Sequence, residues 1–365
     1  SRPDASVRLA AVADAGRGVA GEMRRISDEI QSVRRNADAA IAQDVETLNV
    51  SLGLIEDLDS QIFRLGRGGR DVTGLIDQRQ AAVDRIAPIV PIREVARDGG
   101  RIALFTTGGA VLFDGRAGEL GFIPHPAIEP DLTLAGGDLS GLTLNGVALR
   151  TEGDYAPMRG GRLAAQFDLR DRIAPEAQAA LDGVARDLVE RLQDPTLDAT
   201  LAPGDAGLFT DGGFAFAPAD EIGLSARIEL NARVDPAAGG AAWRLRDGIG
   251  AAAPGDEGAS GLLQAIADRL AEARAPVSGP LAGVSRSAAG LAAELLSNVS
   301  AGRQAQERLA TVDGARRDAL REQELRGGVD TDEEMRRLLL LEQAYAANSR
   351  VIQTLDELMQ SLLRI

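Results

Sequence analysis

Residues 338 to 365 read LLLLEQAYAANSRVIQTLDELMQSLLRI. Eight side chains in this stretch follow a 3-4-3-4-3-4-3 spacing, which places them on one face of an α-helix. The stretch contains no proline or glycine, and Thr331 with Glu334 forms a capping-box pattern just before it. The pattern predicts a terminal amphipathic helix over residues 331–365. Its predicted assembly face, called the terminal stripe below, consists of Leu338, Leu341, Tyr345, Asn348, Ile352, Leu355, Met359 and Leu362.

The predicted terminal helix needs a packing partner to be ordered. Burying its large side chains would contribute roughly 10–20 kcal/mol at most, while ordering the backbone costs about 1–2 kcal/mol per residue. An isolated helix of this length is marginal in water. We therefore expect order only when the terminal stripe packs on another helix, in this chain or in a second one. An ordinary C-terminal core helix is the alternative.

The segment from residue 327 to 365 also resembles a known ending. An acidic entry at Asp332-Glu333 leads into the apolar run and then into Gln343-Ala344-Tyr345. This pattern resembles the C-terminus of the flagellar hook-associated protein 1 family, the family of the hook–filament junction. The resemblance implies that the terminal helix packs with an N-terminal helix as the innermost layer of a tubular assembly. The matching residues are Gly328, Val329, Asp332, Glu333, Leu338, Leu341, Gln343, Ala344, Tyr345, Ala347, Arg350, Val351, Ile352, Thr354, Glu357 and Leu362.

Composition limits the possible functions. The 365 residues can hold two or three domains. The absence of cysteine excludes disulfides and thiol chemistry, and a formal charge of −15 argues against nucleic-acid binding. No apolar run reaches membrane-spanning length, and no secretory signal peptide is visible. The first residue is Ser1, so we expect a processed chain or part of a longer one, without its N-terminal partner helix and export signal.

Residues 1–97 are expected to form the N-terminal part of a helical stem. Two apolar series with helical spacing cover Ser6 to about Leu65, with a phase shift between them. Charged residues between them, including Arg34 and Asp38, are expected on solvated faces. The first series is Met23, Ile26, Ile30, Val33 and Ala37, and the second is Ile41, Val45, Leu48, Leu52, Ile55, Leu58, Ile62 and Leu65.

A short polar motif follows the long helix. Leu75, Asp77, Gln78 and Arg79 resemble the second half of an N-D-L-L-D-Q-R signature of the same family. A D-Q-R sequence on a helix could be catalytic, but a solvated ion pair or a cap is the commoner role. We therefore assign it no catalytic role.

Residues 98–159 are expected to form a β-rich segment. Apolar runs alternate with the turn dipeptides Gly108-Gly109, Asp114-Gly115 and Asn145-Gly146. The only histidine, His125, lies between two prolines. Without a second histidine or a cysteine, we expect neither a zinc site nor a Ser-His-Asp triad.

Residues 160–195 are expected to form a stem-associated helix, which Pro175 should kink or interrupt. Gly160, Gly161, Leu163, Arg170 and Asp171 resemble a G-G-x-L…R-D helix of the same family. Three further segments follow: a small mixed β-containing outer domain at 196–280, the C-terminal part of the stem at 281–330, and the terminal helix at 331–365.

The predicted fold class is α+β, elongated and multidomain. A long helical-bundle or coiled-coil stem would come from both chain ends, with β-rich domains inserted between them. Helices from the two ends could lie antiparallel and bury each other's apolar faces.

The resemblance implies a structural protein of the bacterial flagellum, outside the cell and exported by the flagellar type III apparatus. Subunits would form a ring, and the partners would be hook protein, the next hook-associated protein and an export chaperone at the C-terminal helix. We expect no catalytic residues, cofactor or metal, and no nucleic-acid or membrane partner.

Three alternatives stay open. The chain could be another axial protein, namely hook-associated protein 3, a hook protein or a distal-rod protein. It could be a peptidoglycan-acting enzyme with a carboxylate pair, although a sugar cleft normally uses aromatic residues and these make up only 3% of the chain. It could also be a coiled-coil adaptor that dimerises through residues 1–65.

Overall fold

The computed structural model describes residues 6–153, 155–327, 335–336, 338–343 and 345. The chain divides into two compact units, Ser1–Leu295 and Leu296–Ile365, which are described separately. Among the described residues, no helix is both long enough and apolar enough to cross a membrane.

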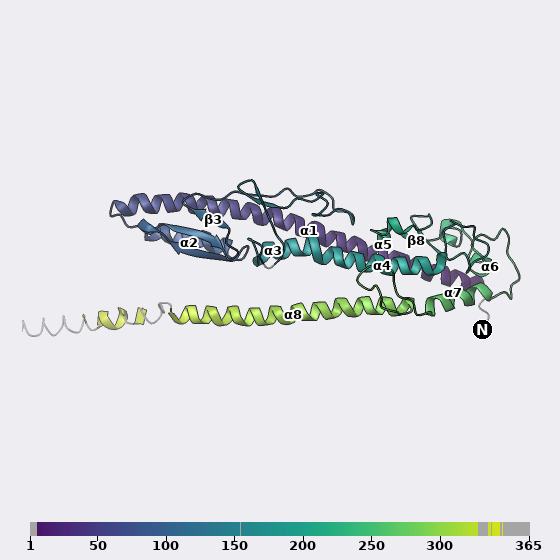
Figure 1. Ribbon diagram of the computed structural model, residues 1–365. Coiled ribbons are helices and arrows are strands. Elements are labelled where there is room, and N and C mark those ends of the chain that lie inside the picture. Colours follow the sequence, from purple (N-terminus) through teal and green to yellow (C-terminus); the bar gives the residue numbers. More distant parts are fainter. Residues whose placement is uncertain (1–5, 154, 328–334, 337, 344, 346–365) are drawn as a thin grey trace, which may run out of the picture. The chain divides into compact units, whose positions relative to one another are not determined.

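The first unit is built on one long helix. Helix α1 runs from Ser6 to Arg67, 62 residues or roughly 93 Å at 1.5 Å per residue. It contains glycines but no proline, and its two apolar series join into one continuous helix. It ends at a glycine turn, where Gly69 adopts φ +68°. Figure 1 shows α1 in purple, with later elements of the unit along its length.

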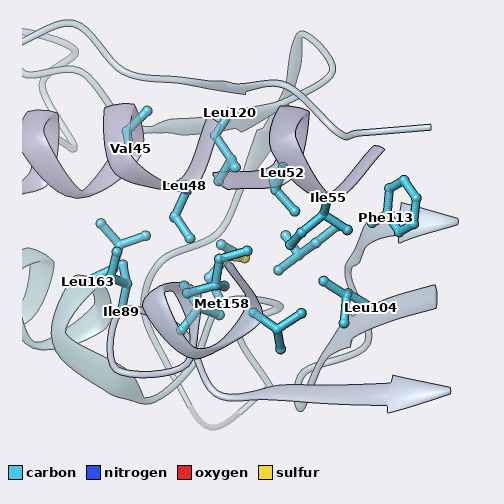
Figure 2. Close-up of a cluster of buried hydrophobic side chains, with 14 of the residues drawn as sticks. Val45, Leu48, Leu52, Ile55, Ile89, Leu104, Phe113, Leu120, Met158 and Leu163 are labelled. Carbon is cyan, nitrogen blue, oxygen red and sulfur yellow. The ribbon is translucent and has the colours of Figure 1, made fainter. Parts of the chain in front are cut away.

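A first core forms around the second half of α1. Helix α2, Thr73–Ile86, folds back against α1 after the glycine turn. Figure 2 shows apolar side chains of α1 meeting side chains from the strands, from two loop residues, Ile89 and Met158, and from Leu163 in the helix Gly161–Asp168. The labelled members are Val45, Leu48, Leu52, Ile55, Ile89, Leu104, Phe113, Leu120, Met158 and Leu163.

Two small antiparallel sheets cover this core, as the turn dipeptides predict. Asn145 and Gly146 adopt φ +54° and +79° in the tight turn between β5 and β6, which fits an Asn-Gly hairpin. The first sheet has the order β1–β2–β3 and the second β4–β5–β6. Their bounds are Ile92–Ala96, Ile102–Thr106, Val111–Asp114, Leu120–Gly121, Leu142–Leu144 and Val147–Leu149.

The predicted interruption near Pro175 takes an unusual form. Helix α3, Gly161–Asp168, passes through a π-helical turn, Leu169–Ile173, into α4, Ala174–Gln193. Pro175 lies in the first turn of α4, directly after the π-helical turn, and has no N–H to donate to the helical turn before it. The stretch therefore stays helical, and the wider turn absorbs the interruption.

A second core forms around the first part of α1. It combines apolar residues of α1 and α4 with residues 201–249, so residues 196–280 share a core with the stem. The unit boundary lies after Leu295, and the domain boundary expected at residue 196 stays a prediction. Its smaller elements are β7 Phe209–Asp211, α5 Leu224–Arg227, β8 Ile228–Leu230, α6 Arg244–Asp247 and α7 Gly261–Ala271.

The last long helix, α8, runs from Ala288 to Gly327 and crosses the boundary between the units. Leu291 is buried with Val184 and Leu281 in a small third cluster of the first unit. Farther along, Val299, Leu309 and Leu320 are exposed. A helix predicted for residues 281–330 is therefore present, from Ala288 to Gly327.

The α+β class, with a helical stem and inserted strands, is confirmed. The expected antiparallel packing of helices from the two chain ends stays a prediction. The long N-terminal helix contacts α2, α3, α4, α5 and β8, which come from the middle of the chain. The second apolar series is buried from Ile41 to Ile62, whereas Met23, Ile26, Ile30 and Val33 of the first series are only half-buried.

Candidate assembly surface

The described part of the terminal stripe is exposed. Leu338, Leu341 and Tyr345 are 61%, 72% and 78% exposed, so the structure shows no described neighbour that buries them. The other predicted members lie outside the described residues: Asn348, Ile352, Leu355, Met359 and Leu362. The assembly role of the stripe therefore stays a prediction.

The first unit carries an apolar groove that our sequence analysis missed. Its volume is about 750 Å³, and one wall is the face of α1 at Val12, Gly16, Val19 and Met23, of which Val12 and Val19 are exposed. The other walls come from α4, α7, the first turns of α8, and residues around β7 and β8. We call it the α1–α7 groove.

The groove exists because the start of α1 has two apolar faces. Leu9, Ala13 and Ala20 are buried in the second core, while Val12 and Val19 remain 49% and 45% exposed. The exposed face follows a 4-3-4 spacing from Val12 to Met23, the same signal as in the terminal stripe. This spacing could have been read from the sequence, but the alanines and glycines around it weaken the pattern.

Between its two cores, α1 packs through polar side chains. Ser27, Gln31, Arg34 and Asp38 are all buried and also follow a 4-3-4 spacing; we call them the polar ladder. Ser27 and Gln31 both donate to Gln178 Oε1 at 3.0 Å. The prediction of a solvated face is therefore wrong for Arg34 and Asp38, because α4 and the π-helical turn supply polar partners for this face.

Arg34 holds a loop against the stem. Its guanidinium donates to the carbonyls of Glu129 at 2.9 Å and Leu132 at 2.6 Å, and its Nε donates to the carbonyl of Arg170 at 3.1 Å. Burial lowers the pKa of Arg34, and Asp171 acts against that shift. The group remains a cation that fixes backbone positions, because arginine pKa values start far above neutrality.

Arg170 is the centre of the π-helical turn. It is fully buried and pairs with Asp38 at 2.6 Å and with Asp171 at 2.7 Å. Its guanidinium also lies over the rings of Phe122 and Phe167, 5.4 and 5.1 Å from their centroids. Burial by itself lowers the pKa of Arg170, but the hydrogen bonds that Arg170 donates to Asp171 and Asp38, and the charges of these two carboxylates, outweigh burial and raise the pKa. Every charge in this cluster is paired, which is typical of a structural lock.

The D-Q-R motif also has a structural role, but its arginine is buried and not solvated as predicted. Asp77 and Gln78 are exposed, but Arg79 is buried. Arg79 Nη1 donates to Asp59 Oδ1 of α1 and to the carbonyl of Gly100, both at 2.8 Å. The expected solvated ion pair is therefore a buried one for Arg79, because α2 folds back onto α1.

The structure defines the surroundings of His125, the only histidine of the chain. His125 lies in a loop, and its backbone N–H donates to Asp38 Oδ2 at 2.8 Å. Within the described ranges, no group of three or more His, Asp or Glu residues could hold a metal ion.

Comparisons with known proteins agree on a flagellar relationship. A family model described as the flagellar hook-associated protein FlgK helical domain matches residues 1–202. A second, described as the flagellar basal body rod FlgEFG protein C-terminal, matches residues 327–365. No curated protein matches the chain.

One solved structure is similar in part. It is the flagellar hook junction protein FlgK from Burkholderia pseudomallei, with 20% sequence identity and a TM-score of 0.44. The similarity covers 57% of this chain and 37% of that one. The chain therefore spans less than half of that relative's length.

Proposed function

The chain belongs to the family of the flagellar hook-associated protein FlgK, and on this premise we propose that it is a structural subunit of the junction between flagellar hook and filament. The match of the helical-domain model over residues 1–202, more than half of the chain, carries the proposal. The buried residues Arg79, Arg170 and Leu163, which our sequence comparison matched to family motifs, support it because they lock the same helical stem.

In this proposal, subunits form a ring through helical packing. The first unit supplies a stem that two apolar cores and the polar ladder keep in one arrangement. The terminal stripe supplies apolar side chains for contact between subunits, beginning with Leu338, Leu341 and Tyr345, whose exposure in the single chain leaves them free for this use. Hook protein and the next hook-associated protein would contact the two sides of the ring.

The same proposal places the protein outside the cell. The flagellar type III apparatus would export it, and a chaperone would cover the C-terminal helix before export. A cover is needed because an exposed apolar stripe promotes premature association. We assign no enzymatic activity, since the polar clusters of the stem are internally paired.

A second candidate is another axial component, such as a hook, distal-rod or hook-associated protein 3 subunit. The observation in its favour is the match of residues 327–365 to the C-terminal model of the basal body rod proteins. The longer match over residues 1–202 favours the junction.

Electron microscopy of cells lacking this gene tests the junction role, together with an assay for flagellin in the culture medium. We expect bare hooks and monomeric flagellin in the medium, both reversed by a plasmid copy of the gene. Normal filaments would contradict the junction role. Absence of hooks would favour a rod or hook component instead.

A further inference from the structure

The segment that joins α7 to α8 lies against α4, and we call residues 272–287 the strap. The two ends of the strap are paired with each other. The backbone N–H of Arg274 donates to the carbonyl of Arg286 at 3.0 Å, and that of Arg286 donates to the carbonyl of Arg274 at 3.1 Å. Between these ends, Leu281 is buried in a small apolar cluster with one residue each from α4 and α8. The strap is therefore a closed loop with one apolar anchor.

A single buried arginine of α4 fastens the strap. The Arg191 side chain is 1% exposed, and its Nη1 donates to the carbonyls of Arg269 at 2.9 Å and Glu272 at 2.7 Å. Its Nη2 donates to the carbonyl of Arg286 at 3.0 Å. These carbonyls belong to the last turn of α7 and to the two ends of the strap. One guanidinium thus holds the end of α7 and the segment before α8 on the same helix.

The counterion of Arg191 belongs to α4 as well. Arg191 Nε donates to Asp187 Oδ2, one helical turn earlier, at 2.6 Å. The ion pair therefore stays together if the strap leaves α4, and water can then hydrate both charges and the freed carbonyls. The Arg170 cluster is different, because Asp38 lies on another helix and separation would leave a buried charge unpaired.

One buried oxygen beside the strap has no partner. Asp187 Oδ1 is enclosed, lies 3.6 Å from Arg274 Nε and, within the described residues, accepts no hydrogen bond. Arg274 instead binds Glu190 through its Nη2, and its side chain is 31% exposed. A buried acceptor without a donor costs free energy, which is recovered when water reaches it. The closed strap therefore carries a cost that opening removes.

The apolar anchor of the strap is small compared with the two cores. Leu281 shares its buried cluster with Val184 and Leu291, whereas each core gathers buried side chains from several helices and strands. Segments with few buried apolar contacts open locally at a lower free energy than the whole domain unfolds. The strap has the composition of such a segment.

We propose that the strap is a conformational switch: it opens from α4 while both cores stay folded, and it releases the start of α8. Ser287 ends the strap and accepts a hydrogen bond on its Oγ from the N–H of Gly290 in α8 at 3.1 Å. Leu291 of α8 lies in the same buried cluster as Leu281. Opening therefore frees the first turns of the helix that leads into the second unit. The switch lies within one chain and does not depend on the junction role.

A single introduced thiol can report the opening, because the chain contains no cysteine. Leu281→Cys places the thiol under the closed strap, and Leu48→Cys places it at a fully buried position of the first core. The rate of reaction with a water-soluble aromatic disulfide is measured at several urea concentrations below the unfolding transition. The thiol of Leu281→Cys should react at least about 100-fold faster than that of Leu48→Cys, with a weaker dependence on urea, because local opening exposes less surface than unfolding.

Arg191→Met, added to Leu281→Cys, tests the fastening. It removes three hydrogen bonds to the strap and leaves Asp187 buried without its cation in the closed state. The thiol should therefore react about 100-fold faster. Arg172→Met is the matched control, since Arg172 is half exposed and its partners Asp168 and Glu176 lie outside the strap. It should leave the rate unchanged within about twofold, and circular dichroism checks that each variant is folded.

Gly279→Ala loosens the strap without changing a charge, in case Arg191→Met fails to fold. Gly279 adopts φ +74°, and a Cβ there would lie 2.8 Å from the carbonyl oxygen of Ala179 in α4. The thiol of Leu281→Cys should react at least about tenfold faster in this background. Gly283→Ala is the control, because it shares a positive φ of +82° but its Cβ meets nothing within 4 Å. Its effect should be smaller, since it adds strain without the contact.

Leu52→Ala separates local opening from unfolding of the core. The loss of this side chain destabilises the first core equally whether the strap is closed or open. It should therefore accelerate the reaction of Leu48→Cys and leave that of Leu281→Cys unchanged. Hydrogen exchange of the unchanged chain gives a comparison without any substitution: the paired amides of Arg274 and Arg286 should exchange at least about 100-fold faster than those of α1 around Leu52.

Several results would overturn the inference. Equal rates and equal urea dependences for the thiols of Leu281→Cys and Leu48→Cys would show that the strap opens only when the core unfolds. Acceleration of the Leu281→Cys reaction by Leu52→Ala would show the same. A Leu281→Cys thiol that reacts in the folded chain as fast as in the unfolded chain would show that the strap is not fastened.

The two strap variants decide what fastens it. A rate that Arg191→Met leaves unchanged would exclude the fastening by this arginine. An effect of Gly283→Ala as large as that of Gly279→Ala would exclude the close contact between the strap and α4.

Discussion

The buried arginines of this chain act as connectors between segments far apart in the sequence. Arg34 reaches carbonyls about a hundred residues away, and Arg170 joins the π-helical turn to α1 through Asp38. Arginine suits this work because its planar fork donates several hydrogen bonds in fixed directions and stays charged when buried. Removing such a cation leaves its carboxylate partners uncompensated in the interior.

Arg170→Met tests this lock. The change leaves Asp38 and Asp171 buried without their cation, so we expect the free energy of unfolding to fall by about 3–5 kcal/mol, measured by urea denaturation. Arg172→Met is the matched control, since Arg172 lies two residues away and is half exposed. Its cost should be below about 1 kcal/mol. Equal losses of unfolding free energy in the two variants would contradict a stabilising role for the buried Arg170 ion pairs.

The pair of Arg17 and Asp235 gives a pH dependence. Arg17 donates to both carboxylate oxygens of Asp235, at 3.0 Å and 2.5 Å. These bonds lower the pKa of Asp235 below its ordinary value. Because the folded-state pKa is depressed, the stabilisation is present above the ordinary aspartate pKa of about 3.9 and is lost as the pH falls through the folded-state value.

Asp235→Asn should therefore lower the free energy of unfolding at pH 7 by about 1 kcal/mol. The difference from the unchanged chain should shrink as the pH falls below about 4 and vanish once Asp235 is protonated in both states. Urea denaturation at several pH values measures this. Asp14→Asn is the control, because the more exposed Asp14 contacts the same arginine at 3.1 Å. A deficit that stays constant at low pH would refute the charge-based explanation.

At the scale of elements, the two-glycine start of α3 shows why this motif uses glycine. Gly160 and Gly161 adopt φ +78° and +73°, a region that other residues avoid. A Cβ on Gly161 would lie 2.4 Å from the carbonyl oxygen of Ile89. The same carbonyl accepts a hydrogen bond from the N–H of Leu163 at 3.1 Å, and that of Pro88 accepts one from the N–H of Arg162 at 3.1 Å. The glycines thus let α3 start close to the segment of residues 88–91 between α2 and β1.

Gly161→Ala should lower the free energy of unfolding by roughly 2 kcal/mol or more, because strain at positive φ adds to the backbone clash. Thermal denaturation measures the loss. Gly74→Ala, in the first turn of α2, is the control: a Cβ there meets nothing within 4 Å. It should leave stability unchanged or raise it by up to about 1 kcal/mol. A Gly161→Ala variant as stable as this control would exclude the close approach.

At the scale of the whole molecule, α1 couples the two cores of the first unit. One unbroken helix carries Leu52 in the first core and Leu9, Ala13 and Ala20 in the second. The polar ladder between them is buried and bonded to α4 and the π-helical turn. With no hinge between the cores, we expect the unit to unfold as one cooperative structure.

Leu52→Ala tests the coupling from a distance. Loss of this fully buried side chain should cost about 2–5 kcal/mol. The single tryptophan, Trp243, lies at the start of α6 beside the second core, so its fluorescence reports that region. The urea concentration at the midpoint of the transition followed by Trp243 fluorescence should fall with Leu52→Ala. It should stay unchanged with Leu296→Ala, because Leu296 is exposed. If Leu52→Ala leaves the midpoint of the Trp243 fluorescence transition unchanged, the two cores unfold separately.

Elements with a local signal can be predicted from the amino-acid sequence alone. Helical periodicity gave α1 and α8 nearly to their ends, turn dipeptides gave the strands, and Pro175 marked the irregular turn. The flagellar family followed from short motifs that include Arg79, Gly161 and Arg170. The terminal stripe is also visible as a local pattern in the sequence, but the sequence pattern does not show which surface it packs against.

Only the tertiary structure decided which faces are buried. Arg34 and Asp38 carry the same charges as their solvated neighbours, and their burial depends on partners some 90 to 140 residues away in the sequence. The α1–α7 groove likewise forms only where α4, α7 and α8 come together beside Val12 and Val19 of α1. The periodicity of a segment shows that one of its faces is apolar. It does not show which distant segment packs on that face, because packing depends on both partners.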